Sequence, residues 1–141
     1  MTVQDSPTGW VKSHIDKYVA TDGEQGHEWQ PGVYTLLLTT TGRKSGAQRR
    51  TALIYQPDGD NHVVVASNGG SQGQPTWYLN LLENPEVHVQ VGADEFTAKA
   101  RAASAEERPR LWSLMNEVWP AYSEYETKTD REIPVVILER V

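Results

Sequence analysis

The 141-residue sequence contains no cysteine, and this absence excludes several kinds of site. Without thiols the chain has no disulfide, no cysteine nucleophile and no thiolate metal centre. Long apolar runs are also missing, since no segment approaches the roughly 20 residues that a membrane-spanning helix needs. The N-terminus lacks the basic and then apolar plan of a signal peptide. We therefore expect a cytoplasmic protein.

Carboxylates are missing from one segment of an otherwise acidic chain. The formal net charge is −6, yet no Asp or Glu lies between residues 33 and 57. The same segment contains Arg43, Lys44, Arg49 and Arg50. The rest of the chain therefore has nine Lys and Arg residues against 19 Asp and Glu. The acidic balance argues against nucleic acid as the main partner. The local basic segment indicates a specific anionic ligand.

The hydrophobic pattern predicts an α+β fold. Most of the expected strands are joined by hairpins, which favours an antiparallel sheet curled into a small barrel with helices outside it. We treat residues 1–32 as an N-terminal helix and connector and residues 33–141 as the barrel, within a single domain. Ser104 and Glu107 form a capping-box pattern, and Pro109 makes the first turn of that helix irregular or late. About six strands are predicted, at 33–40, 49–57, 62–67, 86–91, 95–103 and 133–141, and helices at 7–20, 76–83, 104–119 and 121–126.

The stretch GRKSG, residues 42–46, is the first candidate site. Successive backbone N–H groups in a glycine-flanked turn can surround an anion, and Arg43 and Lys44 add charge. Arg49, at the start of the returning strand, points back toward this turn. A solvated basic hairpin is an equally weighted interpretation. The spacing matches neither a Walker loop nor a dinucleotide fingerprint.

Three further groups of residues are candidates, each with a simpler structural explanation. Ser67 and Asn68 end a strand before a glycine-rich loop, and an ordinary loop is the favoured interpretation there. Trp77 and Tyr78 open a helix and either pack in the core or line a planar cofactor. Tyrosines at spacing i, i+3 share a helical face that lines a pocket or, more often, packs in the core. That face consists of Trp119, Tyr122 and Tyr125.

The histidines give no metal-site signal. His14, His27, His62 and His88 are scattered, and none pairs with another His, Asp or Glu at metal-binding spacing. No nucleophile-elbow motif is present, although sequence order alone leaves a Ser–His–Asp arrangement open.

Several motifs, taken in order, resemble one family. Five stretches are similar to those of the actinobacterial deazaflavin-dependent nitroreductases and quinone reductases. They are LLTTTGRKSGAQRRTALIY, DGDNHVVVASNGG, PTWYLNLLENPEVHVQVG, the Ser104–Trp112 region, and the segment from Tyr122 through IPVVILE. These enzymes belong to the split β-barrel superfamily of flavin and deazaflavin oxidoreductases. The resemblance covers the chain from about Val33 to its C-terminus. It implies coenzyme F420, an 8-hydroxy-5-deazaflavin whose tail carries a lactyl phosphate and several glutamates.

The resemblance also implies roles for the candidate residues. The cations and the turn backbone would hold the phosphate and tail, the following strand would line the ring, and the tyrosine face would border the acceptor. The implied cofactor-binding residues are Gly42, Arg43, Lys44, Ser45, Gly46, Arg49, Thr51, Ala52, Ser67, Asn68, Trp77 and Tyr78. The implied catalytic residues are Tyr122, Tyr125 and Ser67, with Tyr122 or Ser67 stabilising a developing oxyanion and water as an alternative proton source.

The sequence departs from the family pattern at three positions. Asn68 stands where many relatives carry Lys, Ala52 where relatives often have Pro, and Trp119 where some members have Tyr. Acceptor preference, including nitroimidazole reduction, is therefore not carried over.

The implied reaction is hydride transfer from C5 of the reduced deazaflavin to a quinone, an enone or an activated nitroaromatic. Two other classes remain open, an FMN-dependent oxidoreductase of the same superfamily and a non-catalytic deazaflavin-binding protein. We expect a monomer or homodimer. Because quinones dissolve in lipid, peripheral contact with the inner face of the membrane is a further open alternative.

Overall fold

The chain folds around one strongly curled sheet. The structure, a computed structural model, describes residues 3–5, 9–67, 70 and 73–141. The described residues form nine strands and four helices. The strands are β1 (Val3–Asp5), β2 (Glu28–Gln30), β3 (Val33–Thr41), β4 (Gln48–Ile54), β5 (Gln56–Asp58), β6 (Asn61–Val65), β7 (Glu86–Val91), β8 (Asp94–Ala102) and β9 (Val135–Arg140), and the helices are α1 (Gly9–Ala20), α2 (Thr76–Glu83), α3 (Arg108–Val118) and α4 (Ala121–Thr127).

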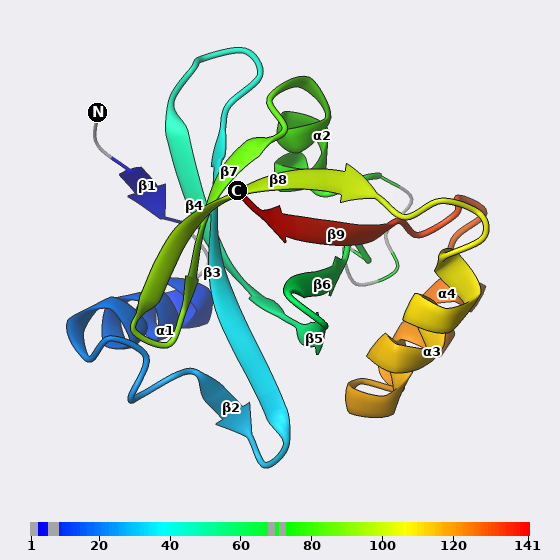
Figure 1. The fold of residues 1–141 in the computed structure, drawn as a ribbon, viewed down its shortest axis with the longest axis horizontal. Helices are drawn as coiled ribbons and strands as arrows, with labels where there is room; N and C mark the ends of the chain where they lie inside the picture. Colours follow the sequence, from blue (N-terminus) through cyan, green and yellow to red (C-terminus); the bar gives the residue numbers. More distant parts are fainter. Residues whose placement is uncertain (1–2, 6–8, 68–69, 71–72) are drawn as a thin grey trace.

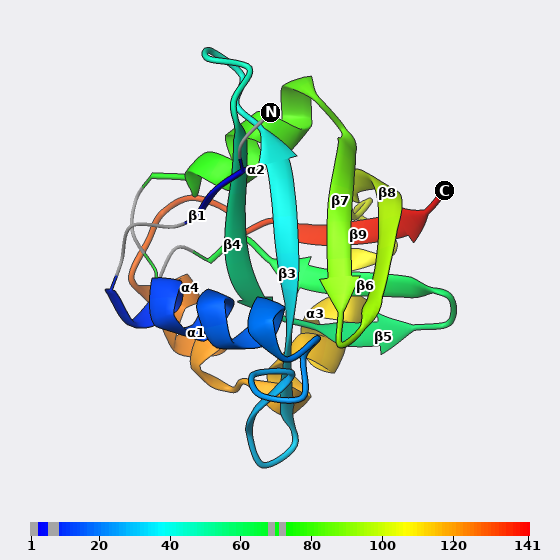
Figure 2. The same ribbon diagram turned by 90° about the vertical axis from the view of Figure 1, so that its left-hand side faces the viewer.

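The sheet order is β1-β4-β3-β7-β8-β9-β6-β5, with β2 added to β3. All described pairings are antiparallel except that of β1 with β4. The long strands β3 and β4 cross the strands β6 and β9 at a steep angle, which curls the sheet around its core (Figures 1 and 2). This arrangement confirms the predicted α+β class and the curled antiparallel barrel.

The predicted second strand is divided in two. The sequence pattern predicts one strand over residues 49–57, but β4 ends at Ile54 and β5 begins at Gln56. The reason is a change of partner at Tyr55. Ile54 pairs with Thr35 of β3, whereas Gln56 pairs with Val63 of β6. The chain therefore passes from one half of the barrel to the other at this residue.

The other predicted elements agree closely with the structure. The predicted spans of α2 and β7 match residue for residue, and α3 begins late, at Arg108, with Pro109 in its first turn. The capping box is formed, since Glu107 Oε1 accepts from the Ser104 N–H at 3.0 Å and Ser104 Oγ accepts from the Glu107 N–H at 3.3 Å. Strands β1 and β2 were not predicted.

Most of the core lies inside the curl of the sheet. One cluster of buried side chains is contributed by β3, β6, β7, β8, β9 and α2, and includes Leu36, Val89 and Leu138. A second cluster lies on the other side of β6 and β9, where Leu111 and Met115 of α3 pack. Burial of these side chains stabilises the fold by about 1.5–3 kcal/mol each.

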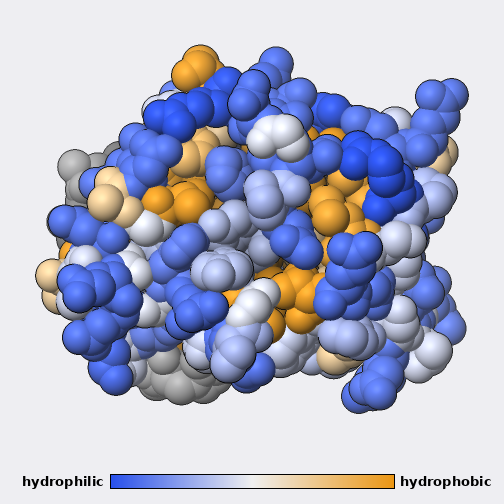
Figure 3. All heavy atoms as spheres, turned by 60° about the horizontal axis from the view of Figure 1, so that its bottom comes forward, coloured by the Kyte–Doolittle hydropathy of each residue, from blue (hydrophilic) through white to orange (hydrophobic). Residues whose placement is uncertain are grey.

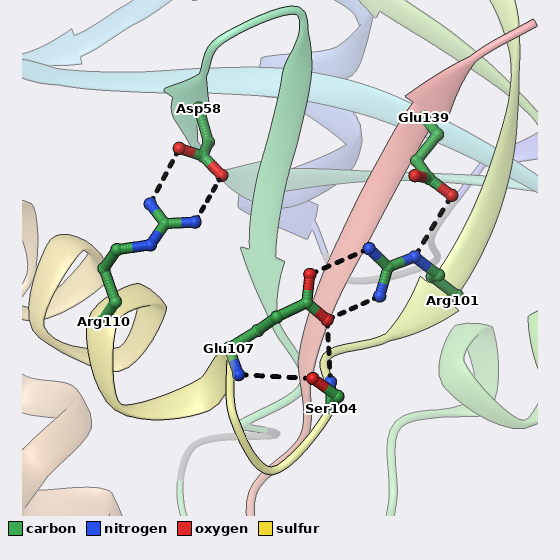
Figure 4. Close-up of polar contacts among 6 residues, drawn as sticks. All are labelled: Asp58, Arg101, Ser104, Glu107, Arg110 and Glu139. Carbon is green, nitrogen blue, oxygen red and sulfur yellow. Dashed lines mark hydrogen bonds and ion pairs between the residues drawn. The ribbon is translucent and has the colours of Figure 1, made fainter.

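Two sets of ion pairs connect α3 and its N-cap residue with the sheet (Figure 4). Arg101 of β8 donates to both carboxylate oxygens of Glu107, at 2.7 and 2.9 Å, and to Glu139 of β9 at 3.2 Å. Arg110 of α3 makes a bidentate pair with Asp58, at 2.9 and 3.0 Å. Helix α3 is therefore attached at its first turn to β8, β9 and the end of β5.

Helix α1 covers the lower part of β3 and β4 (Figure 2). Its side chains Ile15 and Tyr18 are fully buried, against Leu37 of β3. The Tyr18 hydroxyl donates to the Thr35 carbonyl oxygen at 3.0 Å and accepts from the Gly92 N–H at 2.7 Å. Within the described residues, no helix has the length and apolar character needed to span a membrane.

Candidate functional site

The basic turn closes the hairpin between β3 and β4. The Gly42 N–H donates to Ala47 O at 2.7 Å, and the Gly46 N–H donates to Gly42 O at 2.9 Å. A Cβ atom at residue 42 would lie 2.8 Å from Ser45 Oγ and 3.1 Å from Ala47 O, so a larger residue there would displace the Ser45 hydroxyl. Ser45 Oγ also accepts from the Ala47 N–H at 3.2 Å. The turn is therefore a hydrogen-bonded structure with a fixed backbone.

Helix α2 supports the same turn from below. The Arg43 N–H donates to Asn80 Oδ1 at 3.2 Å, and Asn80 Nδ2 donates to Thr40 Oγ1 at 3.3 Å. Asn80 is only 2% exposed, so its amide is fixed by these bonds. The turn thus holds the backbone of Arg43 in place while its charged group is left for other contacts.

Three of the four cations make no ion pair with a carboxylate in the part of the chain that the structure describes. Arg43 is half-buried, and Lys44 and Arg49 are exposed. Protein surfaces normally mix charges of both signs. A cluster of like charges without counter-ions is a suitable site for an anionic group.

A cavity of about 260 Å³ lies at the other end of the same hairpin. Its walls are formed by residues of α1, β2, β3, β4, β6 and the α3–α4 region. On the lower face of the molecule, hydrophobic residues are visible between hydrophilic ones (Figure 3). Between Gln48, where β4 begins, and Ala52, which lines the cavity, the strand rises by about 13 Å. The lining residues are His14, Trp29, Thr35, Ala52, Leu53, Ile54, Val65, Ser67, Trp119, Tyr122 and Tyr125.

The cavity brings together all three predicted catalytic residues. Tyr122 and Tyr125 lie on the same face of α4, with ring centroids 6.2 Å apart, and Ser67 follows β6. Tyr122 is 5% exposed, and burial raises the pKa of its hydroxyl well above the ordinary value. The hydroxyl is therefore protonated at neutral pH and can act as a hydrogen-bond donor.

An arginine that the sequence did not single out fixes the backbone of Ser67. Arg131 donates to Ser67 O at 2.7 Å, to Gln74 Oε1 at 2.7 Å and to Ala66 O at 3.3 Å. Burial lowers the pKa of its guanidinium group, but the group stays charged. Arg131 therefore sets the position of the strand end that carries Ser67.

Glycine at position 70 brings the same loop against α4. Gly70 has φ +83°, and a Cβ atom there would lie 3.1 Å from Cα and O of Tyr125. This contact of backbone against backbone sets the distance between residue 70 and the tyrosine face.

Two lining residues, His14 and Trp29, come from the N-terminal segment and were not predicted as site residues. The Thr35 hydroxyl donates to Gly26 O at 2.8 Å, so its oxygen accepts from His14 Nε2 at 3.0 Å. Burial, followed by the charge of Lys17, lowers the pKa of His14. The ring is therefore neutral at pH 7, with its hydrogen on Nε2 and an acceptor at Nδ1.

Three other predicted residues, Thr51, Trp77 and Tyr78, do not line the cavity. Thr51 lies on β4 next to Ala52 but does not line the cavity. Tyr78 is 9% exposed and packs in the core inside the sheet, with Trp77 against it. Asn68 lies outside the described residues. The roles assigned to these four side chains remain predictions.

The chain is similar to known deazaflavin-dependent reductases. Residues 10–140 match the model of the F420H(2)-dependent quinone reductase family. An F420H(2)-dependent quinone reductase of Mycobacterium tuberculosis (strain H37Rv) is 41% identical over 133 residues, which span 92% of this chain and 89% of the relative. A solved F420-H2 dependent reductase is 44% identical, covering 74% of this chain and 93% of its own, with a TM-score of 0.69. A second solved chain, described as a domain-swapped dimer, is 40% identical and covers 95% of this chain and all of its own, with a TM-score of 0.73. The chain belongs to the F420H(2)-dependent quinone reductase family.

Proposed function

We propose that this protein is an F420H2-dependent reductase that transfers a hydride to a quinone-type acceptor. One observation carries the proposal. Strand β4 joins a turn whose Arg43 and Lys44 form no ion pair among the described residues to a cavity that is lined by two tyrosines and Ser67. A cofactor with a planar ring at one end and a polyanionic tail at the other matches these two sites and their separation.

The donor set fits the cofactor. Arg43, Lys44 and Arg49 offer charge-assisted hydrogen bonds to phosphate and carboxylate oxygens. Ala52 and Ser67 at the cavity leave room for a flat ring, because both side chains are small. When bound, the reduced deazaflavin supplies a hydride from C5.

The residues of the chain orient the acceptor and supply hydrogen bonds. Reduction of a quinone to a hydroquinone requires one hydride and one proton, and negative charge develops on the carbonyl oxygen that the hydride does not reach. The Tyr122 hydroxyl is a preorganised donor for that oxygen, and Ser67 and Tyr125 are the alternative donors in the same cavity. Most of the wall surface is apolar, so a bound acceptor would displace water from it and strengthen these bonds.

A titration of two ligands tests the tail site. We expect Arg49→Ala and Lys44→Ala each to raise the Kd of F420 about tenfold, since a lost charge-assisted bond costs about 1.5 kcal/mol. The same variants should leave the Kd of the deazaflavin without its phosphate and glutamates unchanged. Lys99→Ala, which removes an exposed cation from β8, is the matched control. If Arg49→Ala left the affinity for F420 intact, the tail assignment would be wrong.

Parallel titration with FMN separates this function from the flavin alternative. FMN carries a single phosphate, so we expect it to bind more weakly than F420 and to lose less affinity in the Arg49→Ala variant. A non-catalytic binding protein would retain F420 affinity but fail to oxidise F420H2 with any quinone of a test panel.

We further propose a single domain and a homodimer. The pairing of β1 with β4 and the packing of α1 on β3 and β4 support one folding unit. The similar chain described as a domain-swapped dimer favours the dimer over the monomer. Light scattering after size-exclusion chromatography tests the mass. Cytoplasmic location and peripheral contact with the membrane through a lipid-soluble quinone stay predictions, which co-sedimentation with vesicles tests in part.

A further inference from the structure

A column of four aromatic rings connects the segment after α1 with β6, β8 and β9. It consists of His27, Tyr55, His62 and Phe96, whose successive ring centroids are 5.9, 5.5 and 5.4 Å apart. At its end the guanidinium carbon of Arg140 lies 4.4 Å from the centroid of Phe96. Tyr55 and Phe96 are buried, and the two histidines are half-buried. None of these side chains lines the cavity, so the column is a separate feature of the fold.

His27 attaches the α1–β3 linker, residues 21–32, to this column. Its N–H donates to Gly23 O at 3.2 Å, and its carbonyl oxygen accepts from the Thr35 N–H at 2.7 Å. Its Nε2 lies 2.7 Å from the hydroxyl oxygen of Tyr55, the residue at which the chain changes from one half of the barrel to the other. The His27 side chain therefore joins the linker to the point where the two halves meet.

The bond between His27 and Tyr55 depends on the protonation of the imidazole. Burial raises the pKa of Tyr55 to about 12, so its hydroxyl keeps its hydrogen at neutral pH. Within the described residues, His27 Nε2 is the acceptor for that hydrogen, and the hydrogen of the neutral imidazole is then on Nδ1. A protonated His27 carries hydrogen on both nitrogens. The Tyr55 hydroxyl would have to turn, and its hydrogen would lack an acceptor in a buried site.

The surroundings of His27 keep its ring neutral. Burial lowers the pKa of His27, and the nearby carboxylate of Glu28 opposes this effect in part. Glu28 also accepts a hydrogen bond from the hydroxyl of Tyr34, whose ring centroid lies 5.0 Å from that of His27. Burial is the larger effect, so the intact column disfavours a proton on this ring.

His62 is a second position in the column that disfavours a proton. Its Nδ1 is buried and has no hydrogen-bond partner among the described residues, so a protonated ring would present a buried N–H without an acceptor there. Burial lowers the pKa of His62, Asp94 opposes this effect, and Arg140 adds to it. Asp94 is itself paired with Arg140, at 2.9 and 3.2 Å. The neutral ring is therefore the form that fits the column.

We propose that the column is a pH-sensitive latch, which holds the α1–β3 linker on the barrel at neutral pH and releases it when His27 and His62 are protonated. In the released form His27 no longer covers Tyr55, and both imidazoles reach water and bind protons near their ordinary pKa of about 6.5. The released form then binds more protons than the latched form, so release becomes more favourable as the pH falls below about 6.5. Trp29 lies in the linker, so release also removes one wall of the cavity. This regulation goes beyond the reductase function and does not depend on it.

Hydrogen exchange of the protein without cofactor, at pH 7.5 and pH 5.5, tests the latch. The linker amides and the Thr35 N–H report on release, after each rate is divided by the intrinsic rate at the same pH. With a pKa of about 6.5 in the released form, each histidine favours release by up to about tenfold at pH 5.5. We expect linker protection to fall at least tenfold between the two pH values, while protection of β8 changes less than threefold. Because His14 bonds to Thr35 and titrates in the same range, the comparison is repeated in a His14→Gln background.

Four variants decide between the latch and a general loss of stability. His27→Gln and His62→Gln should each remove up to about tenfold of the pH effect, and the double variant should remove nearly all of it. Tyr55→Phe keeps the rings but removes the hydroxyl, so it should lower linker protection already at pH 7.5. His88→Gln is the matched control, since this histidine is exposed on β7 and should leave the pH effect unchanged.

The outcomes leave the reductase function untouched. If the wild-type linker showed no loss of protection at pH 5.5, or if the double variant kept the full loss, the latch would be refuted. Thermal unfolding of each variant checks the fold. If the double variant did not fold, the two single variants would decide the question, and an undiminished pH effect in both would refute the latch.

Discussion

Replacing Arg131 tests how the cavity is built. Its guanidinium group makes hydrogen bonds of 2.7 Å to Ser67 O and to Gln74 Oε1, and a longer bond to Ala66 O. The substitution Arg131→Met keeps much of the side-chain volume and removes every donor. Ala66 is fully buried, so its carbonyl oxygen has little access to water in place of the lost donor.

The size of the effect follows from these bonds. A hydrogen bond that involves a charged group contributes about 1.5–3 kcal/mol, and the variant also avoids the cost of desolvating the guanidinium. We therefore expect the free energy of unfolding to fall by about 2 kcal/mol, which lowers Tm by roughly 6–8 °C in a chain of this length. Because the end of β6 is released, Ser67 moves in the cavity, and kcat/KM for menadione should fall about tenfold.

Urea unfolding and steady-state kinetics measure the two effects. Arg110→Met is the control, since it also removes an arginine that donates more than one hydrogen bond, but one whose side chain is 63% exposed. Exposed ion pairs contribute little, so this variant should stay close to the wild type. If Arg131→Met matched the wild type in both stability and kcat/KM, the idea that this arginine positions the Ser67 strand end would be wrong.

Three further predictions concern the loop, the proton donor and pH. Gly70→Ala should lower both Tm and turnover, because φ is positive there and the new Cβ would press on the backbone of Tyr125; unchanged turnover would contradict the contact. Tyr122→Phe should lower kcat with little change in the Kd of F420, and a Kd effect alone would assign Tyr122 to binding. Arg101 lowers the pKa of Glu107 to about 2, mainly through its hydrogen bonds. The Glu107 carboxylate therefore stabilises the fold at pH values above its unfolded pKa of 4.5, and this contribution is lost as the pH falls toward 2. Thermal unfolding at about pH 5 and about pH 3 should therefore show a smaller decrease in Tm for Glu107→Gln than for the wild type, and equal decreases would contradict the pairing.

Local sequence patterns predicted much of the fold. The alternating run in residues 86–91 and the segment TWYLNLLE produce β7 and α2 with the predicted bounds, because their periodicity and their flanking Pro residues act locally. Strand β2 escaped prediction because its three residues have no periodic pattern, and it exists only through pairing with β3. The division between β4 and β5 was not predicted for the same reason, since the change of pairing partner at Tyr55 depends on β6.

The site was predictable where its residues form a local pattern. Tyr122 and Tyr125 share a helical face, and both line the cavity, while Tyr122 also belongs to the buried cluster beside α3. Their catalytic roles stay predictions. His14, Trp29 and Arg131 were missed because they reach the cavity or its supporting loop through contacts between distant segments. The placement of Trp77 and Tyr78 also depends on tertiary packing, and the structure puts them with the core inside the sheet.

Oxidation of F420H2 by menadione tests the central claim most directly. The reaction is followed without oxygen, through the absorbance of the oxidised deazaflavin, with and without the protein. We expect the protein to accelerate the reaction with saturation in both substrates, and one menadione to be reduced for each F420H2 consumed. A rate equal to that of the uncatalysed mixture, at cofactor concentrations where titration shows the site to be filled, would contradict the assignment of this chain as an F420H2-dependent quinone reductase.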